Sequence, residues 1–494
     1  MVTLAEANGG IPLTLYGVSP EELAEDVYYR RDFFELHRGS GFIDCIEGPS
    51  FHAGAVVRAI EGTDLEDLET PWGYGGPIAT SHEQMRQGMW LWRQRQREAG
   101  RVAEFVRLHP FLNPLAVHDY YADIKFDRVT IAVDLSLPRE QRRRVYSEGT
   151  KNRLRRAARS MTVVRLGIEH AEDFRRCYET GLDRNNALSA YYFGDDYYEK
   201  ILASPWATCL GGQLDGEIVS IACFLHTGIF CHYHLSGSTS DGRAKFAHYL
   251  LLDHAFDYFS EKGARLMHLG GGRTERPDDA LLEFKKKFSR WRLAFYTAGA
   301  IYDPEAYAQL STGDTRRFLN YRFSLTPRDE VGDVVLRKAT IQDLTSYFQL
   351  KCDVSNIFWS GHVSPPDWRH LSAWYTALFN ENMKREVFIA EMHSRVIGYA
   401  YLDDKNDHLE STLGVAASES NRARGRHLLM EMVKILRERN ETRSVEAWIF
   451  KENIASVKAH EAAGFVLDSS RPTRSSNMPF VKNGNIQSCW VWRV

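Results

Sequence analysis

The sequence predicts a mixed α/β (α+β) protein of three consecutive units, on the basis of three observations. The chain has 494 residues, and a typical domain of roughly 150 residues suggests about three of them. Hydrophobic residues make up 44% and charged residues 26% of the chain, an ordinary balance for globular protein with several cores. Strand-like and helix-like segments alternate along most of the chain, which favours helices packed on partly parallel sheets.

Changes in pattern divide the chain into four segments. The stretch 303–333 is polar and contains Pro304 and Pro327, so we expect it to be irregular. The proposed segments are a first unit at 1–145, a second unit at 146–305, a linker at 306–333 and a third unit at 334–494.

Hydrophobic periodicity and turn residues set the expected elements. In the first two units we expect helices at 83–100, 146–160 and 246–262, and strands at 207–213, 217–226, 230–236 and 266–269. In the third unit we expect strands at 334–340, 387–392, 396–403, 408–416 and 444–450, and helices at 426–439 and 454–463.

Charge, cysteines and apolar runs exclude several classes of protein. A formal net charge of −3 is unlike a generally basic surface, so nucleic acid would need a local basic patch. The cysteines form no C-x-x-C pair, so we expect no metal site, no disulfide framework and the reduced thiols of cytoplasm. We expect neither a secretion signal nor a membrane span, since histidines interrupt the most apolar run, 218–235.

A basic, glycine-containing loop in the third unit is suited to a pyrophosphate. A strand ends near Val415 and a helix begins near Arg426, so free backbone N–H groups and the helix dipole can meet an anion. The candidate cofactor-binding residues are Val415, Arg422, Arg424, Gly425, Arg426, His427 and Asn453. A solvated basic loop is the simpler alternative.

This loop resembles that of the GNAT superfamily, Arg/Gln-x-x-Gly-x-Gly/Ala. The last position departs from that pattern because His427 occupies it and narrows the phosphate pocket. A later series, Asn453, His460 and Gly464-Phe465, is similar to the family's Asn…Tyr…Gly-Phe signature. The resemblance implies a C-terminal N-acyltransferase domain that uses acetyl-CoA or another acyl-CoA.

The same resemblance implies acid–base roles for two residues of the third unit. Glu410 lies on the strand before the loop, where the family often places its base. His460 stands where the family often has an acidic tyrosine, and histidine can donate a proton near neutral pH. The alternatives are a solvated strand charge and a half-buried packing residue.

An ordered set of motifs in the first two units resembles the FemAB family and its FemX-like relatives. It begins with an aromatic–glycine run at 70–77, continues through Arg107-Leu-His109-Pro and a basic helix, and ends with Phe284-Lys285. The resemblance implies two GNAT-like subdomains that transfer an amino acid from aminoacyl-tRNA to an amine of a peptidoglycan precursor, sugar or natural product.

Residues within these motifs are the candidates for substrate contact. Lys285 matches the family's lysine near the reacting groups, where an ammonium can stabilise a carbonyl oxygen or hold a phosphate. The candidate substrate-binding residues are Trp72, Tyr74, Gly75, Gly76, Arg107, His109, Arg153, Arg156, His234, Gly270, Gly271 and Gly272. A glycine-rich corner held by aromatic residues is the alternative for the run at 70–77.

The second unit has a bulky side chain where a phosphate loop would need glycine. Phe246 follows Arg243 by three residues, and its ring would block the close approach of a pyrophosphate. The expected donor for this pair of units is therefore not CoA.

A dense basic run precedes this region. We hypothesise that it contacts tRNA or a diphosphate-bearing acceptor, although such helices are most often solvated faces. The run comprises Arg142, Arg143, Arg144, Lys151, Arg153, Arg155, Arg156 and Arg159.

Three interpretations of function follow. The first is an aminoacyl-tRNA-dependent transferase fused to an acyl-CoA-dependent domain. The second is an N-acetyltransferase dependent only on acetyl-CoA, with the first two units binding the acceptor. The third is a binding protein with decayed sites, which His427 and His460 keep open.

Overall fold

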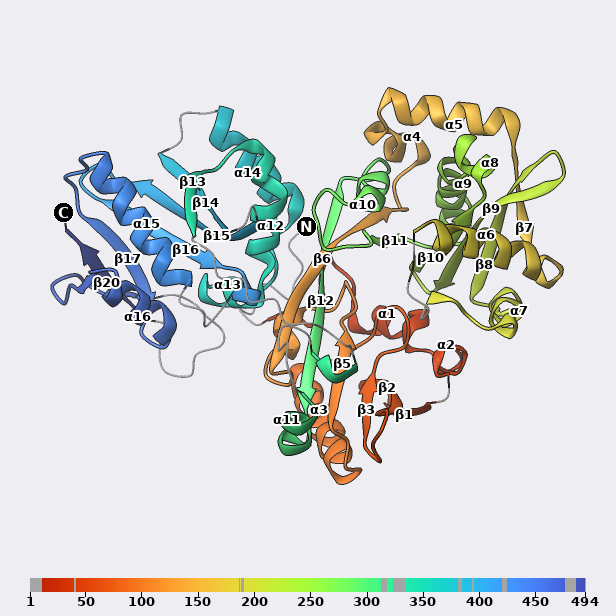
Figure 1. The fold of residues 1–494 in the computed structure, drawn as a ribbon, viewed down its shortest axis with the longest axis horizontal. Coiled ribbons are helices and arrows are strands. Elements are labelled where there is room, and N and C mark those ends of the chain that lie inside the picture. The colour runs from red at the N-terminus through yellow and green to blue at the C-terminus, as the bar shows by residue number, and fades with distance from the viewer. Residues whose placement is uncertain are drawn as a thin grey trace. The chain divides into compact units, whose positions relative to one another are not determined.

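The computed structural model describes residues 11–39, 41–185, 187, 191–311, 318–322, 334–380, 384–392, 395–419, 424–475 and 486–493. Within these residues the strands form two mixed sheets, one of 12 strands and one of 8 (Figure 1). The predicted mixed α/β class is confirmed. Among the described helices, none combines the length and the apolar character needed to cross a bilayer.

The first sheet takes its strands from the part of the chain before residue 302. They are β1 (Phe42–Glu47), β2 (Phe51–Ala59), β3 (Glu66–Glu69), β4 (Ile78–Ala79), β5 (Ala103–Arg107), β6 (Asp123–Asp134), β7 (Thr162–Leu166), β8 (Ala207–Leu214), β9 (Glu217–Thr227), β10 (Phe230–Ser238), β11 (Leu266–Gly271) and β12 (Trp291–Ile301). The spatial order is β1-β2-β3-β5-β12-β6-β11-β10-β9-β8-β7, with β4 paired to β2.

The α-helices before residue 311 vary in length from one turn to nearly five. They are α1 (Pro20–Ala24), α2 (Arg31–His37), α3 (His82–Glu98), α4 (Arg139–Arg142), α5 (Glu148–Ser160), α6 (Ala171–Arg184), α7 (Asp195–Ala203), α8 (Ser240–Ala244), α9 (Ala247–Glu261), α10 (Ala280–Lys285) and α11 (Pro304–Leu310). Helix α6 packs on β9 and β10, and α9 packs on β8, β9 and α5.

The second sheet takes its strands from the last third of the chain. They are β13 (Val335–Lys338), β14 (Arg385–Met392), β15 (Arg395–Asp404), β16 (Leu409–Val415), β17 (Val445–Phe450), β18 (Val466–Leu467), β19 (Arg474–Ser475) and β20 (Ile486–Trp492). The order is β13-β14-β15-β16-β17-β20-β18, with β19 paired to β20. The helices are α12 (Leu344–Cys352), α13 (Val354–Trp359), α14 (Trp368–Asn380), α15 (Arg424–Glu438) and α16 (Ile454–Ala462).

Alternation along β14 explains why this second sheet is covered on both faces. Phe388 and Ala390 belong to the core that contains the buried side of α15. Val387 and Ile389 belong to a second core, formed with side chains of α12 and α14. Because successive side chains of a strand point to opposite faces, this one strand contributes to both layers.

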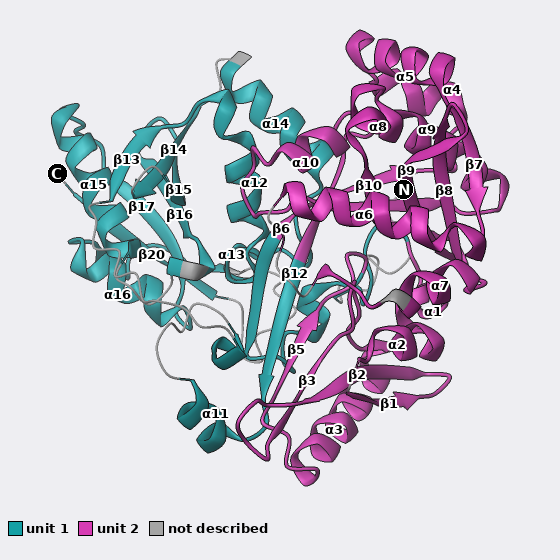
Figure 2. Cartoon of the chain, turned by 45° about the vertical axis from the view of Figure 1, so that its right-hand side comes forward, with its two compact units in different colours: residues 1–17, 112–127, 296–494 teal, residues 18–111, 128–295 magenta. Residues whose placement is uncertain are grey.

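The chain divides into two compact units (Figure 2). Unit 1 comprises residues 1–17, 112–127 and 296–494, and unit 2 comprises 18–111 and 128–295. The two predicted N-terminal subdomains share the 12-stranded sheet, and their proposed boundary at 145 stays a prediction.

The predicted elements agree with the observed ones to within a few residues, with one difference. We expected the stretch 303–333 to be irregular, but it begins with helix α11. Asp303 caps this helix by accepting hydrogen bonds from the backbone N–H groups of Glu305 and Ala306, and Pro304 occupies its first turn. These are ordinary helix-start signals that the polar composition concealed.

Candidate active site

Strands β10 and β11 run parallel and separate after a short ladder. Their paired residues end at His232 and His268. Each strand also has an irregularity in its antiparallel pairing just beyond this point, between Tyr233 and Leu235 and between His268 and Gly270. Such irregularities change the direction of side chains and are common beside active sites.

Lys285, the last residue of α10, lies against the glycines that end β11. Its Nζ donates a 2.7 Å hydrogen bond to the carbonyl oxygen of Gly271. Gly270 has a φ of +73°, and a Cβ added there would lie 3.3 Å from the same Nζ. Glycine therefore both adopts this left-handed backbone without strain and leaves the space beside the amine open.

Burial sets the protonation of Lys285. It lowers the pKa of the amine to about 7, Asp279 opposes this shift, and Arg128 adds to it. At neutral pH the side chain is therefore present as both ammonium and free amine. The ammonium can stabilise a carbonyl oxygen that gains negative charge, and the amine can accept a proton.

Aromatic side chains surround this amine. The Tyr233 ring centroid lies 5.9 Å from Lys285 Nζ, and the Tyr74 hydroxyl lies 3.9 Å from the Cβ position of Gly270. The Tyr74 ring makes edge contacts with His268 at 5.0 Å and with Tyr28 at 5.3 Å between centroids. The predicted site residues Tyr74, Gly270 and Lys285 thus come together in unit 2.

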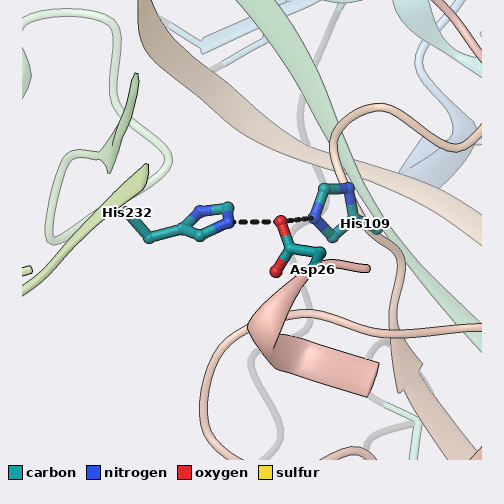
Figure 3. A group of neighbouring side chains, drawn as sticks. All are labelled: Asp26, His109 and His232. Atoms are coloured by element: carbon teal, nitrogen blue, oxygen red, sulfur yellow. Dashed lines mark hydrogen bonds and ion pairs between the residues drawn. The ribbon is translucent and has the colours of Figure 1, made fainter. Parts of the chain in front are cut away.

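Elsewhere in unit 2, a buried carboxylate lies between two imidazoles (Figure 3). Asp26 Oδ2 is 2.6 Å from His232 Nε2 and 3.4 Å from His109 Nε2. All three residues are buried, Asp26 completely. Burial opposes the ionisation of Asp26, but the charge of His232 and hydrogen bonds from His109 and His232 hold the carboxyl pKa below its ordinary value.

The rest of the aromatic–glycine run braces the ends of β3 and β5. Gly75 donates its backbone N–H to Arg107 and accepts that of His109, both at 2.8 Å. Arg107 donates to the carbonyl oxygen of Thr70 at 2.9 Å, and its guanidinium lies 5.8 Å from the Trp72 ring centroid. Gly76 follows with a φ of +104°. The substrate contacts predicted for these residues stay predictions.

His234 belongs to a second group of imidazoles in unit 2. The Tyr197 hydroxyl lies 3.4 Å from His234 Nε2 and 3.2 Å from His37 Nε2. Burial lowers the pKa of His234 well below its ordinary value, with smaller contributions from His37 and His232. His234 is therefore neutral near pH 7.

Much of the predicted basic run is neutralised within unit 2. Arg142 pairs with Asp257, and Arg143 pairs with Asp253. Lys151 pairs with Glu148 at 2.8 Å. Contact with tRNA or a diphosphate stays a prediction and rests on fewer free charges than the sequence suggested.

Two arginines of the basic run lie over the ring of Phe246. The guanidinium carbon of Arg156 is 4.9 Å and that of Arg153 is 5.7 Å from the ring centroid. Phe246 is the N-cap of α9, with a left-handed backbone and no side-chain capping bond. Its ring and the two arginines therefore gather near the N-terminus of α9.

In unit 1, the described candidate CoA residues lie at the starts of α15 and α16 and at the end of β16. Arg424 begins α15 and has its Nε 3.5 Å from Glu419 Oε2. Asn453 caps α16 by accepting the backbone N–H of Ser456 at 3.1 Å. The other described candidates are Val415 at the end of β16, the half-buried Gly425, and the exposed Arg426 and His427. Arg422 lies outside the described residues.

The two predicted acid–base residues of the third unit have defined partners. Glu410 pairs with Arg474 and lies 3.6 Å from Lys405 Nζ. Burial raises the Glu410 pKa, but the hydrogen bond from Arg474 brings it below the ordinary value. His460 Nδ1 lies 2.8 Å from the carbonyl oxygen of Ser456, and burial lowers the His460 pKa to about 4. Their roles stay predictions.

Two groups of described residues have ligand atoms close enough to hold a cation. One is Asp26, His109 and His232, and the other is His408, Glu410 and Glu446. Both Glu410 and Glu446 already form ion pairs with arginines, Arg474 and Arg471. The expectation that the protein has no metal site stays a prediction.

Sequence analysis overlooked several residues of the site in unit 2. Asp26 and Tyr28 belong to no motif, and no sequence signal singles them out. His232 and His268 lie within the strands expected at 230–236 and 266–269, and their place on those strands was the available signal.

Comparison with known proteins identifies relatives for both parts of the chain. Residues 352–465 match the model of the acetyltransferase (GNAT) family. The UDP-N-acetylmuramoylpentapeptide-lysine N(6)-alanyltransferase of Weissella viridescens is 25% identical over 173 residues, 34% of this chain and 50% of that protein. A crystal structure of FemX is similar at 12% identity and a TM-score of 0.48, over 63% of this chain and 98% of the other.

A further solved structure, spermidine N-acetyltransferase from Vibrio cholerae with CoA and spermine, is 16% identical with a TM-score of 0.29. It covers 32% of this chain and 94% of that one. The match with the Weissella protein spans half of that protein's length. The family model and this curated relative confirm the two resemblances predicted from the sequence, to GNAT and to FemAB-like proteins.

Proposed function

We propose that the protein is an N-acyltransferase that joins an activated acyl group to an amine, with its principal site where β10 and β11 separate. The observation that carries this proposal is Lys285. Its amine is buried and bonded to the carbonyl of Gly271 at 2.7 Å, and Gly270 places no side chain against it.

This arrangement suits the chemistry of amide formation. The acceptor nitrogen attacks the acyl carbonyl carbon, the carbonyl oxygen gains negative charge, the leaving group departs, and the nitrogen loses a proton. A fixed ammonium in a water-poor site stabilises that oxygen far better than one in water. Lys285 is the buried cation that would do so.

For this site we propose an aminoacyl-tRNA donor and an amine acceptor on a peptidoglycan precursor, sugar or natural product. The similarity to an alanyltransferase that acts on a UDP-N-acetylmuramoylpentapeptide lysine supports this donor and acceptor class. Phe246 supports a donor other than CoA, because its ring lies at the N-terminus of α9, where a pyrophosphate would bind.

A second acylation, dependent on acetyl-CoA or another acyl-CoA, is proposed for the C-terminal domain. The GNAT match supports it. So does the start of α15: among the described residues, a Cβ added to Gly425 would meet no atom closer than 3.9 Å, which suits the close approach of a phosphate to this helix N-terminus. The ladder of β16 and β17 is also short and pairs only Leu409 with Val445 and Glu410 with Glu446.

Both donors and the seven free thiols suit a cytoplasmic reaction. The test is incubation of the protein with amine acceptors and either a labelled aminoacyl-tRNA mixture or labelled acetyl-CoA. We expect label on an amine from the tRNA mixture, and this transfer should be lost in Lys285→Met. Transfer from acetyl-CoA alone, unaffected by Lys285→Met, would favour a purely CoA-dependent enzyme.

Absence of transfer from either donor, with acetyl-CoA binding measured by calorimetry, would favour the binding protein. Where acetyl-CoA is used, Glu410→Gln and His460→Asn test the two acid–base predictions. A large fall in turnover would support each role, and wild-type turnover would remove it.

A further inference from the structure

The Asp26 cluster lies outside the reacting groups of the proposed site, yet it joins three separate parts of unit 2. Asp26 precedes a short 3₁₀ helix (Val27–Tyr29), His109 follows β5, and His232 lies on β10 (Figure 3). Asp26 and His232 are 206 positions apart in the chain. A contact between such distant segments restricts the geometry of the whole unit.

The carboxylate of Asp26 contacts each of these segments. Oδ1 accepts the backbone N–H of Tyr28 at 3.1 Å. Oδ2 faces the Nε2 atoms of His232 and His109. Because Asp26 is completely buried, water cannot replace any lost donor, and an unpaired buried carboxylate would be costly.

The hydrogen bond that His109 accepts from the backbone argues against a metal ion bound to this histidine. The backbone N–H of Phe111 donates to His109 Nδ1 at 3.3 Å, so Nδ1 must carry a lone pair. In a neutral imidazole the proton is then on Nε2, the atom that faces Asp26. A protonated Nε2 can donate to a carboxylate but cannot ligate a metal.

The cluster reaches the proposed site through aromatic contacts. The Tyr28 ring contacts both His232, at 4.6 Å, and Tyr74, at 5.3 Å between centroids. A Cβ on Gly73 would lie only 2.1 Å from Tyr28 Cε1, so the chain beside Tyr74 packs directly on this ring. Tyr74 in turn has its hydroxyl beside Gly270.

We infer that Asp26 is a positioning residue: its carboxylate accepts hydrogen bonds from His232 and Tyr28, faces Nε2 of His109, and through these contacts fixes Tyr74 beside Lys285. This inference rests on the proposed acyl transfer at Lys285. His232 also forms the last rung of the β10–β11 ladder, so the same carboxylate anchors the point where the two strands separate.

The test compares Asp26→Asn with Asp44→Asn. Asp44 is another buried carboxylate of unit 2, bonded to Arg95 and Gln96, and it serves as a control for a general loss of stability. Turnover of labelled aminoacyl-tRNA should fall about a hundredfold in Asp26→Asn with unchanged KM, as expected for a reacting group displaced by about 1 Å. Asp44→Asn should keep wild-type turnover. Equal turnover in the two variants would overturn the inference.

Two measurements test the positioning role of Asp26 without measuring turnover. They therefore separate this inference from the proposed function. Imidazole ¹⁵N NMR of the wild-type protein should find the Nε2–H form of both His109 and His232; stoichiometric bound zinc, or an Nδ1–H form of His109, would overturn it. A fluorotyrosine at position 74 should change its ¹⁹F resonance in Asp26→Asn but not in Asp44→Asn. An unchanged resonance in a folded Asp26→Asn would also overturn it, and the wild-type NMR result stands if that variant fails to fold.

Discussion

Two parallel strand pairs, β10–β11 in unit 2 and β16–β17 in unit 1, separate after similarly short ladders. The first pair ends in histidines, whereas the second ends in carboxylates that form ion pairs. The first ends at His232 and His268, both buried. The second pairs Glu410 with Glu446, and arginines with side chains nearly half exposed neutralise both carboxylates. The backbone geometry is shared, so the surroundings of each pair set its chemistry.

The pKa values of the titrating groups have different causes in the two places. Burial determines them beside β10–β11, whereas charged neighbours determine that of Glu410 at β16–β17. At β10–β11, burial lowers the pKa of His268 well below its ordinary value and that of Lys285 to about 7. At β16–β17, burial raises the Glu410 pKa, but the hydrogen bond and charge of Arg474, together with Lys405 and His408, bring it below the ordinary value and keep the carboxylate ionised. Beside the first pair, Lys285 can therefore change protonation near neutral pH and His268 stays neutral, whereas Glu410 in the second pair stays charged.

In a third parallel pair, β3–β5, another segment of the chain forms hydrogen bonds beyond the end of the ladder. Its ladder pairs Leu68 with Glu104 and Glu69 with Phe105. Beyond it, the backbone of Gly75 bonds to Arg107 and His109. The aromatic–glycine run therefore continues the hydrogen bonding where the other two pairs leave it interrupted.

The largest expected effect concerns the buried amine of the first pair. Lys285→Met should lower acyl transfer by about 10²–10³-fold, the usual loss on removing one group that stabilises the oxyanion. The matched control is Lys286→Met, because Lys286 bonds to Glu283 at 2.6 Å. Steady-state kinetics with the labelled donor measure both. Equal turnover in the two variants would contradict a contribution of the buried Lys285 amine to acyl transfer.

The second prediction tests burial of an imidazole in unit 1. Burial lowers the His460 pKa from 6.5 to about 4, so between these values the unfolded chain binds more protons than the folded chain. Stability is therefore lost as pH falls from about 6.5 to about 4, by about 3 kcal/mol at most for this group.

His460→Gln should remove this part of the pH dependence, since glutamine does not titrate. Hydrogen exchange of the peptide covering α16, followed between pH 7 and 4, measures the local opening free energy after correction for intrinsic exchange. The same pH dependence in wild type and variant would contradict a buried, neutral His460.

The third prediction separates backbone strain from contact with Lys285. Gly270→Ala and Gly263→Ala both place a Cβ at positive φ, with φ of +73° and +90°, and each should cost about 1–2 kcal/mol in stability. At Gly270 the added Cβ meets Lys285 Nζ, whereas at Gly263 it meets no described atom within 4 Å. Turnover should fall about tenfold in Gly270→Ala through displacement of the amine. Equal turnover losses would implicate strain alone.

The smallest effect is expected at the ion pair of the second strand pair. Arg474→Ala should lower the unfolding free energy by less than about 1 kcal/mol, because half-exposed ion pairs contribute little. Arg474 also lies 3.7 Å from the Trp448 ring centroid. Urea unfolding at low and high salt measures the change, which should shrink with salt. A loss of several kcal/mol would mean that this pair is effectively buried.

Elements with regular hydrophobic patterns were predictable from the sequence. The expected helix at 246–262 is observed as α9, Ala247–Glu261, because its apolar positions repeat with the helical period. Helix α11 was missed even though Asp303 and Pro304 are local start signals, since a short polar helix has little periodicity. Lys285 and Gly270 were predicted from motifs, whereas Asp26 was not.

The sequence by itself determined the order of strands and helices, the glycines that end β11 and the lysine of α10, because these depend on neighbouring residues. Only the tertiary structure decided which groups meet. Asp26 obtains its partners from His109 and His232, and Lys285 titrates near pH 7 because folding removes it from water. Such long-range contacts and burial have no local signature. For the same reason, β10–β11 and β16–β17 have similarly short ladders but differ in the burial and ion pairing of the side chains at their ends.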